Sequence, residues 1–175
     1  MTFWSERLKV ALFTTHIPLK AAIEKIKKEN LINFFRNLHK NVSLILTENF
    51  SFLTAGLNPH AGENGLLGTE EEMEIIPAIK EAQREGINIS GPYPPDVVFR
   101  KCLNKSDKIS IALYHDQGCI PFKLESFESG VNVTLGLPFI RTSPDHGTAY
   151  DIAGKGKANP QSMIEAIKLA YALSL

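Results

Sequence analysis

The chain has 175 residues, of which 43% are hydrophobic and 22% charged, so it is long enough for one globular domain with its own core. Its 19 Lys and Arg residues balance 19 Asp and Glu residues, and this zero formal charge gives no overall attraction to nucleic acid or to an anionic membrane. No apolar run approaches the roughly 18 residues of a membrane span, so we expect a cytoplasmic protein without an export or anchoring signal.

The first predicted element is a strand over residues 8–13, an apolar, β-prone run that ends in a polar loop carrying His16. A helix follows, because apolar residues recur at steps of three and four between residues 30 and 45. Residues 51–57 then predict a second strand, and the glycine-rich loop after it carries His60.

The next predicted helix lies between two turn signals. Thr69 and Glu72 match a capping box at its start, Pro77 is expected to kink or split it, and Gly86 marks its end. Residues 91–95 are then predicted to form a turn-rich connector.

The last third of the chain predicts two strands and a closing helix. Residues 109–114 form an apolar run that ends at His115, and residues 131–135 predict the fourth strand. Asn159 and Pro160 are suited to the start of the closing helix, whose apolar face consists of Met163, Ile164, Ile167 and Tyr171. Strands that alternate with helices predict an α/β fold, in which loops at strand ends usually carry the chemistry.

Three of the five histidines, His16, His60 and His115, each follow a separate predicted strand. Neutral imidazole suits zinc and similar divalent metals, and three protein ligands leave a coordination position for a substrate. Ordinary loop or capping histidines are the alternative, because spacing does not show that the three converge. The glycines after the second strand could present N–H groups to an anion, although a tight turn that supports His60 is the preferred interpretation.

Five stretches, in this order, resemble the signature of the 4-hydroxythreonine-4-phosphate dehydrogenase family: TTHIPL (14–19), GLNPHAGENGLLGTEE (56–71), GPYPPD (91–96), YHDQG (114–118) and GVNVTLGLPFIRTSPDHGTAYDIAGKGKA (130–158). The resemblance implies a divalent metal, with zinc as the first choice and magnesium or cobalt as alternatives. It implies three metal ligands: His16, His60 and His115. It also implies three contacts to a small phosphorylated, amino-acid-like substrate: Lys123, Asn132 and Arg141. A guanidinium fork and a mobile ammonium group both suit phosphate or carboxylate.

The stretch 145–160 also resembles the adenine-side NAD loop of the isocitrate and isopropylmalate dehydrogenases, to which the family is structurally related. The resemblance therefore implies a layered α/β/α fold of that type, with NAD contacts at His146, Gly147, Thr148 and Asp151. The sequence has no G-x-G-x-x-G at the start of a βαβ unit, so a Rossmann-type NAD site is not expected. In the family the site forms at a homodimer interface, and the histidine matching His115 is donated across it.

The departure from the family is length, because its members carry an additional amino-terminal portion of comparable size that nothing here matches. The resemblance implies that residues 1–140 form most of the metal- and substrate-binding domain. Residues 141–175 would supply the NAD loop and a closing helix that returns to the missing domain. We expect a truncated reading frame, an expressed fragment or one half of a split protein, and its uncovered apolar surface should favour self-association.

The reaction implied by the resemblance is the NAD- and metal-dependent oxidation and decarboxylation of 4-phosphohydroxy-L-threonine to 3-amino-2-oxopropyl phosphate, a step of vitamin B6 biosynthesis. One alternative is a related dehydrogenase for a phosphorylated sugar acid such as 4-phosphothreonate or 4-phosphoerythronate, since nothing here separates an amino group from a hydroxyl at C2. Two others are a non-catalytic fragment and a three-histidine metal-binding module without redox chemistry.

Overall fold

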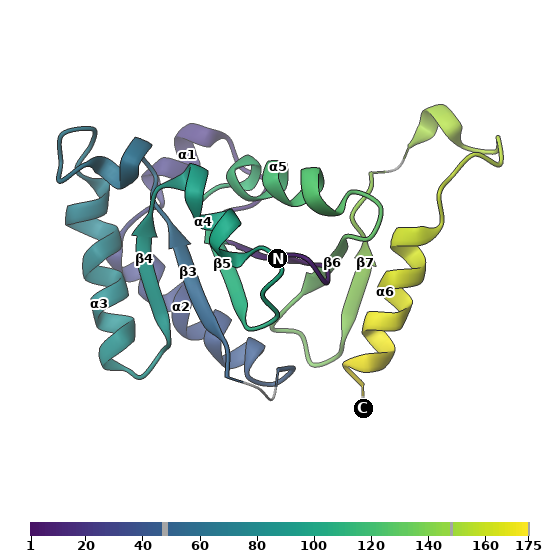
Figure 1. Cartoon of the computed structure of the whole chain (residues 1–175), viewed down its shortest axis with the longest axis horizontal. Helices are drawn as coiled ribbons and strands as arrows, with labels where there is room; N and C mark the ends of the chain where they lie inside the picture. The colour runs from purple at the N-terminus through teal and green to yellow at the C-terminus, as the bar shows by residue number, and fades with distance from the viewer. Residues whose placement is uncertain (47–48, 148, 175) are drawn as a thin grey trace.

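The computed structural model describes residues 1–46, 49–147 and 149–174, which form one seven-stranded sheet with helices around it (Figure 1). The strands are β1 (Thr2–Trp4), β2 (Lys9–Leu12), β3 (Ser51–Ala55), β4 (Ile89–Tyr93), β5 (Lys108–Ala112), β6 (Val131–Thr134) and β7 (Arg141–Pro144). The α-helices are α1 (Leu19–Glu24), α2 (Lys28–Val42), α3 (Ile76–Arg84), α4 (Pro95–Cys102), α5 (His115–Ser126) and α6 (Gln161–Ala172). Two 3₁₀ turns, η1 (Pro59–Gly62) and η3 (Tyr150–Ile152), and a π-helical turn, η2 (Glu71–Ile75), complete the structure.

The sheet has the strand order β4-β3-β5-β2-β1-β6-β7 and consists of two parts. β4, β3, β5 and β2 are parallel, as expected where helices connect successive strands. β1, β6 and β7 extend the sheet in antiparallel fashion from β2. Three of the four parallel strands, β2, β3 and β5, match predicted strands, and the α/β prediction is confirmed.

Helices cover both faces of the parallel part. On one face, α2 and α3 bury apolar side chains such as Phe35 and Ile79 against Phe52 and Ile111. On the other face, α4 and α5 form a second cluster, in which Phe122 packs on Phe3 with ring centroids 5.4 Å apart. The predicted α/β/α layering is therefore confirmed, whereas the closer relation to the isocitrate and isopropylmalate dehydrogenases stays a prediction.

Three predictions of local structure are wrong. The expected connector 91–95 belongs to strand β4 and the first turn of α4, because Tyr93 still pairs with Ala55 of β3 at the sheet edge. The polar stretch after residue 114 is the first turn of α5 rather than a loop. The capping box is absent, since η2 begins after Glu70 without a side-chain cap. Pro77 does mark a break, because the π-helical turn gives way to α3 beside it, and Gly86 follows the end of α3 with a φ of 85°.

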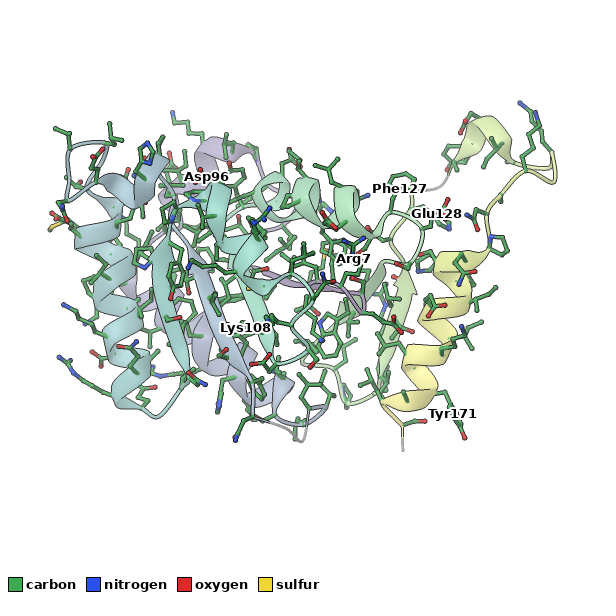
Figure 2. All side chains as sticks on the ribbon, in the orientation of Figure 1. Arg7, Asp96, Lys108, Phe127, Glu128 and Tyr171 are labelled. Atoms are coloured by element: carbon green, nitrogen blue, oxygen red, sulfur yellow. The ribbon has the colours of Figure 1, made fainter. Side chains whose placement is uncertain are left out.

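The antiparallel extension is covered by α6, which packs Ala166 against Trp4, Val131 and Val133 on the α2 side of the sheet. The predicted apolar face of this helix points the other way, and its side chains are 40–67% exposed: Met163, Ile164, Ile167 and Tyr171. Figure 2 shows Tyr171 on the outer side of α6. Within the described ranges, no helix is long and apolar enough to cross a membrane.

Candidate functional site

His16 and His115 lie side by side because they follow β2 and β5, which are parallel neighbours. Backbone pairing continues past the strand ends, where Thr14 donates its N–H to the Leu113 carbonyl at 3.3 Å. The Thr14 hydroxyl donates to the same carbonyl at 2.8 Å. The two imidazole centroids are 5.3 Å apart within a single chain, whereas the resemblance implies that His115 is donated from a partner.

The His115 ring is held by its neighbours on the first turn of α5. Its Nδ1 lies 2.7 Å from the Asp116 carboxylate, which can only accept, so Nδ1 carries the proton. This arrangement makes Nε2 the acceptor nitrogen of the ring, as in the carboxylate–histidine pairs that orient metal ligands. Nε2 lies 3.6 Å from the sulfur of Cys119, whose pKa burial raises to about 11. The geometry at His115 therefore suits a metal-ligating imidazole.

His60 lies in a loop at the same end of the parallel strands, following β3. Its backbone is left-handed, with a φ of 52°, and the run of positive φ values continues from Ala61 to Gly65. Such conformations cost about 1–3 kcal/mol for each residue other than glycine and persist where surrounding contacts impose them. The imidazole is exposed, so this loop presents His60 to solvent.

Two buried polar side chains fix the base of that loop. The Glu71 carboxylate accepts hydrogen bonds from the backbone N–H groups of Leu57 and Asn58, at 2.7 and 2.8 Å. The Gln117 amide joins the ends of two strands, because it donates to the Gly56 carbonyl at 2.8 Å and accepts from the Leu113 N–H at 2.7 Å. The loop of His60 is thereby tied to the start of the helix that carries His115.

The three histidines do not form one cluster. Among residues 1–46, 49–147 and 149–174, no group of three His, Cys, Asp or Glu side chains is placed to hold a metal ion. One chain brings His16 and His115 together and leaves His60 outside the pair. The three-histidine ligand set stays a prediction.

Lys123, the first predicted substrate ligand, lies on α5 and faces Asp145. Its Nζ donates to the Asp145 backbone carbonyl at 3.2 Å and lies 3.7 Å from the carboxylate. The Asp145 side chain is only 6% exposed, and burial raises the pKa of this carboxyl although the charges of Lys123, His115 and His146 lower it. The Lys123 ammonium therefore lies beside a carboxyl group whose ionised form is disfavoured by burial and favoured by the Lys123 charge.

Asn132 and Arg141 lie on neighbouring antiparallel strands, β6 and β7. Arg141 is opposite Thr134 and donates to its hydroxyl at 2.6 Å, while Asn132 is opposite Ser143. These four residues alternate with Val131 and Val133, which face α6, so they share the face of the sheet on which α5 lies. The Asn132 Oδ1 atom is buried without a hydrogen-bond partner in the described part of the chain. Such an acceptor suits a ligand donor.

The predicted NAD contacts lie between β7 and α6, in a segment that projects from the body of the molecule (Figure 1). His146, Gly147 and Asp151 are all exposed, and Thr148 lies outside the described residues. The hydrogen bonds here are local, such as that from the Lys155 ammonium to the Asp151 carbonyl at 2.6 Å. The NAD contacts stay a prediction.

A pocket of about 240 Å³ lies beside the loop that joins β6 to β7. Arg141 and Asn41 contribute polar groups, but the rest of the lining is mostly apolar, including Leu44, Phe139 and Leu173. None of the three predicted metal histidines borders it. A pocket of this composition does not fit a phosphate-bearing substrate by itself.

Comparison with known proteins identifies the family. The family model described as "Pyridoxal phosphate biosynthetic protein PdxA" matches residues 1–170. The chain belongs to this family. It is 53% identical over 174 residues to the 4-hydroxythreonine-4-phosphate dehydrogenase of Aquifex aeolicus. The matched region covers 97% of this chain and 52% of that protein. The resemblance of the sequence motifs is therefore confirmed.

Two further comparisons bear on substrate and fold. The chain is 48% identical over 175 residues to a protein of Oceanobacillus iheyensis whose name proposes a D-threonate 4-phosphate dehydrogenase, covering 99% of this chain and 53% of that protein. The crystal structure of a 4-hydroxythreonine-4-phosphate dehydrogenase from Klebsiella pneumoniae is 40% identical with a TM-score of 0.85, covering 99% of this chain and 53% of that one. The chain thus spans about half the length of the relatives it matches.

Several residues that sequence reasoning did not single out belong to this site. Asp116 and Gln117 stand inside the YHDQG motif, where the helix position of His115 gives them their contacts. Glu71 stands in a run of three glutamates that is typical of a solvated helix start, and Asp145 precedes the predicted NAD contacts. Their place as polar residues inside a specific motif is the signal that could have identified Asp116 and Gln117.

Proposed function

We propose that the chain supplies the metal- and substrate-binding half of an NAD-dependent dehydrogenase that oxidises and decarboxylates 4-phosphohydroxy-L-threonine. The product would be 3-amino-2-oxopropyl phosphate for vitamin B6 biosynthesis. Oxidation of the C3 hydroxyl to a ketone weakens the bond between C2 and the carboxylate, so that CO₂ leaves and a proton adds at C2. The observation that carries the proposal is the His16–His115 pair, with ring centroids 5.3 Å apart, inside the motifs TTHIPL and YHDQG.

The metal would be held by three histidines: His16, His60 and His115. When bound, a divalent metal supplies Lewis-acid stabilisation of negative charge on the substrate oxygens, and NAD accepts the two electrons of the oxidation. Asp116 supports this role because it fixes the His115 tautomer with Nε2 available. Since one chain brings only two of these rings together, the set would be completed across the dimer interface, with His115 of the partner subunit joining His16 and His60.

The substrate would lie along the face shared by α5 and β6–β7. Lys123 offers a mobile positive charge and Arg141 a planar fork, which suit the phosphate and carboxylate ends. The buried Asn132 amide, with its unpartnered oxygen in the described structure, would orient a substrate N–H or O–H group. His146, Gly147, Thr148 and Asp151 would contact NAD once the amino-terminal portion covers their segment.

A homodimer is part of the proposal. The outer side of α5 exposes three apolar side chains at helical spacing, Ile120, Leu124 and Phe127, at 60, 82 and 71%. Exposed apolar stripes of this kind mark protein contacts. Because His115 begins the same helix, a second copy packed here would bring its own ring close to the first chain's loops.

Metal analysis of the purified chain tests the ligand set. We expect His16→Ala, His60→Ala and His115→Ala each to weaken zinc or Co²⁺ binding by more than the roughly 10–100-fold that loss of a second-shell partner costs. His39→Ala, on α2, is the matched control and should bind metal like the wild type. Unchanged metal stoichiometry in both His60→Ala and His115→Ala would rule out the proposed site.

Formation of NADH tests the reaction and its main rival. The relative from Oceanobacillus iheyensis favours D-threonate 4-phosphate as the second candidate substrate. The two phosphorylated substrates should be compared with this chain alone and with the amino-terminal half of a relative supplied in trans. We expect turnover only in the combined sample. Faster turnover of D-threonate 4-phosphate than of 4-phosphohydroxythreonine would transfer the assignment to the rival.

A further inference from the structure

We infer that Glu71 is a positioning residue that fixes the loop 56–68 and thereby sets the place of His60. Its part in metal binding rests on the function proposed above. The inference itself rests on four observations: the burial of Glu71, the donors it binds, the strained backbone it supports and the glycines that pack around it.

Glu71 is 1% exposed although it stands between two more exposed glutamates. Its Oε1 accepts the consecutive N–H groups of Leu57 and Asn58, and its Oε2 accepts the Asn58 side-chain amide at 2.8 Å. Three hydrogen bonds of this kind compensate for burial of a carboxylate, which is otherwise costly. The Glu71 carboxylate is therefore bound by donors of the loop, and these hydrogen bonds hold the loop against it.

The loop needs such support because its backbone is unfavourable on its own. His60, Ala61, Glu63 and Asn64 have φ values of 52, 54, 44 and 56°, in the left-handed region that residues other than glycine seldom adopt. Backbone hydrogen bonds inside the loop are 3.0–3.4 Å long, and the longest joins the Glu63 N–H to the His60 carbonyl. Contacts from outside must hold this conformation, and Glu71 provides three of them.

The surrounding glycines show that the loop is closed over the carboxylate. A Cβ atom at Gly62 would lie 2.8 Å from Glu71 Oε2, and one at Gly56 would lie 3.1 Å from Oε1. A Cβ atom at Gly68 would lie 2.4 Å from the Asn58 amide nitrogen that Glu71 binds. Gly62 and Gly68 thus have a packing reason that concerns Glu71 or its partner, whereas an added Cβ at Gly56 would lie closest to Ala61, at 2.9 Å from its Cα.

Glu71→Gln is the test substitution, and Glu72→Gln is its matched control. Glutamine keeps one acceptor oxygen for the two backbone N–H groups, but its NH₂ group then faces the Asn58 NH₂ group. Glu72 is exposed, and Glu72→Gln removes the same negative charge one residue away. Asn58→Ala is a milder second variant, because it removes one donor and leaves both backbone donors in place.

Amide hydrogen exchange on the full chain measures the first consequence. We expect Glu71→Gln to speed exchange at residues 57–68 by about tenfold or more, and Asn58→Ala to do so to a smaller extent. Exchange in β2, β5 and α2 should stay at wild-type rates, and Glu72→Gln should match the wild type throughout. Equal exchange of the loop in Glu71→Gln and Glu72→Gln would overturn the inference.

Co²⁺ titration followed by visible absorption measures the second consequence, which loss of fold stability alone would not produce. We expect Glu71→Gln to weaken Co²⁺ binding by about 10–100-fold with its unfolding transition still cooperative, and Glu72→Gln to leave it unchanged. A loosened loop with unchanged Co²⁺ affinity would refute the positioning role. If the wild type binds no Co²⁺, the proposed metal site fails, and hydrogen exchange alone decides whether Glu71 fixes the loop.

Discussion

The parallel part of the sheet and its antiparallel extension differ in how completely the chain covers them. Helices α2 and α3 cover one face of strands β4, β3, β5 and β2, and α4 and α5 cover the other. On the extension, α6 packs its inner side on β6 and β7 and leaves an outer apolar side exposed. The parallel part therefore completes its own core, whereas the extension ends in uncovered apolar surface.

This difference matches the distribution of the predicted site residues. His16, His60 and His115 follow strands of the covered part, where buried groups such as Glu71 and Gln117 fix their loops. The predicted NAD contacts lie beyond the extension, where the side chains are exposed and the hydrogen bonds are local. The covered part fixes the loops of its histidines within one chain, although it brings only two of the three rings together. The extension requires another surface, which we propose is the amino-terminal portion of the relatives.

The largest expected effect separates the two sides of α6 at adjacent positions. Ala166 is 2% exposed against Trp4 and Val133, so Ala166→Asp would bury an unpaired charge. We expect the free energy of unfolding, measured by urea titration, to fall by more than about 3 kcal/mol. Ile167 is 63% exposed, and Ile167→Asp should change the free energy of unfolding by less than about 0.5 kcal/mol.

Sedimentation of the same pair sharpens the comparison. If the outer side of α6 is an uncovered interface, Ile167→Asp should reduce self-association of the isolated chain and its binding of a hydrophobic dye. Similar destabilisation by both substitutions would show that α6 is buried on all sides. The distinction between a covered and an uncovered part would then be wrong.

The second prediction compares two glycines. A Cβ atom at Gly118 would lie 2.6 Å from Leu12 Cδ2 and 2.8 Å from Ala112 Cβ, where α5 crosses the parallel strands. Overpacking costs about 1–3 kcal/mol, and the helix preference of alanine returns up to about 1 kcal/mol, so Gly118→Ala should destabilise by about 1–2 kcal/mol. A Cβ atom at Gly147 meets no described atom within 4 Å, and Gly147→Ala should be neutral within about 0.5 kcal/mol.

Urea unfolding of both alanine variants, with unchanged m-values, checks the prediction. A neutral Gly118→Ala would mean that α5 can move away from β2, and the His115 position would then be less firmly fixed than the structure indicates.

The apolar runs of the sequence were sufficient to predict β2, β3, β5 and β6, because each is a buried strand between turn signals. β1, β4 and β7 were missed for physical reasons. β4 contains Gly91 and Pro92, which indicate a turn, and it forms a strand as the edge partner of β3. β1 has three residues and gains its stability from pairing with β2 and β6 rather than from its own pattern. β7 has the sequence RTSP, which is polar and contains proline, and it forms because β6 offers an edge to pair with.

The candidate site was predictable only in part, because its supporting contacts depend on the tertiary structure. The pairing of His16 with His115 follows from the two strands being neighbours, which no local pattern shows. Glu71 has the sequence environment of an exposed acidic helix start, and only the loop folded over it makes it buried. Residue type and spacing predicted the ligands, whereas the groups that hold them required the fold.

The smallest expected effect concerns Asp145, at the junction of the two parts, and it appears as a pH dependence. Burial raises the pKa of this carboxyl above its ordinary value of 3.8, with the nearby Lys123 charge acting in the opposite direction. The folded chain therefore keeps the proton to higher pH than the unfolded chain. As pH rises from about 3.8 through the raised pKa, Asp145 should lower the stability of the wild type relative to Asp145→Asn.

Urea unfolding of both proteins between pH 3.5 and pH 7, with the exposed Asp151→Asn as the control for loss of a negative charge, measures this difference. Below the unfolded-state pKa, Asp145 is protonated in both the folded and the unfolded chain. The stability difference between the wild type and Asp145→Asn should then vanish. Should the wild type instead gain stability over Asp145→Asn as pH rises, the ion pair with Lys123 would outweigh burial. Lys123 would then be engaged within the chain rather than available to an anionic substrate, and the proposed substrate contact on α5 would have to be given up.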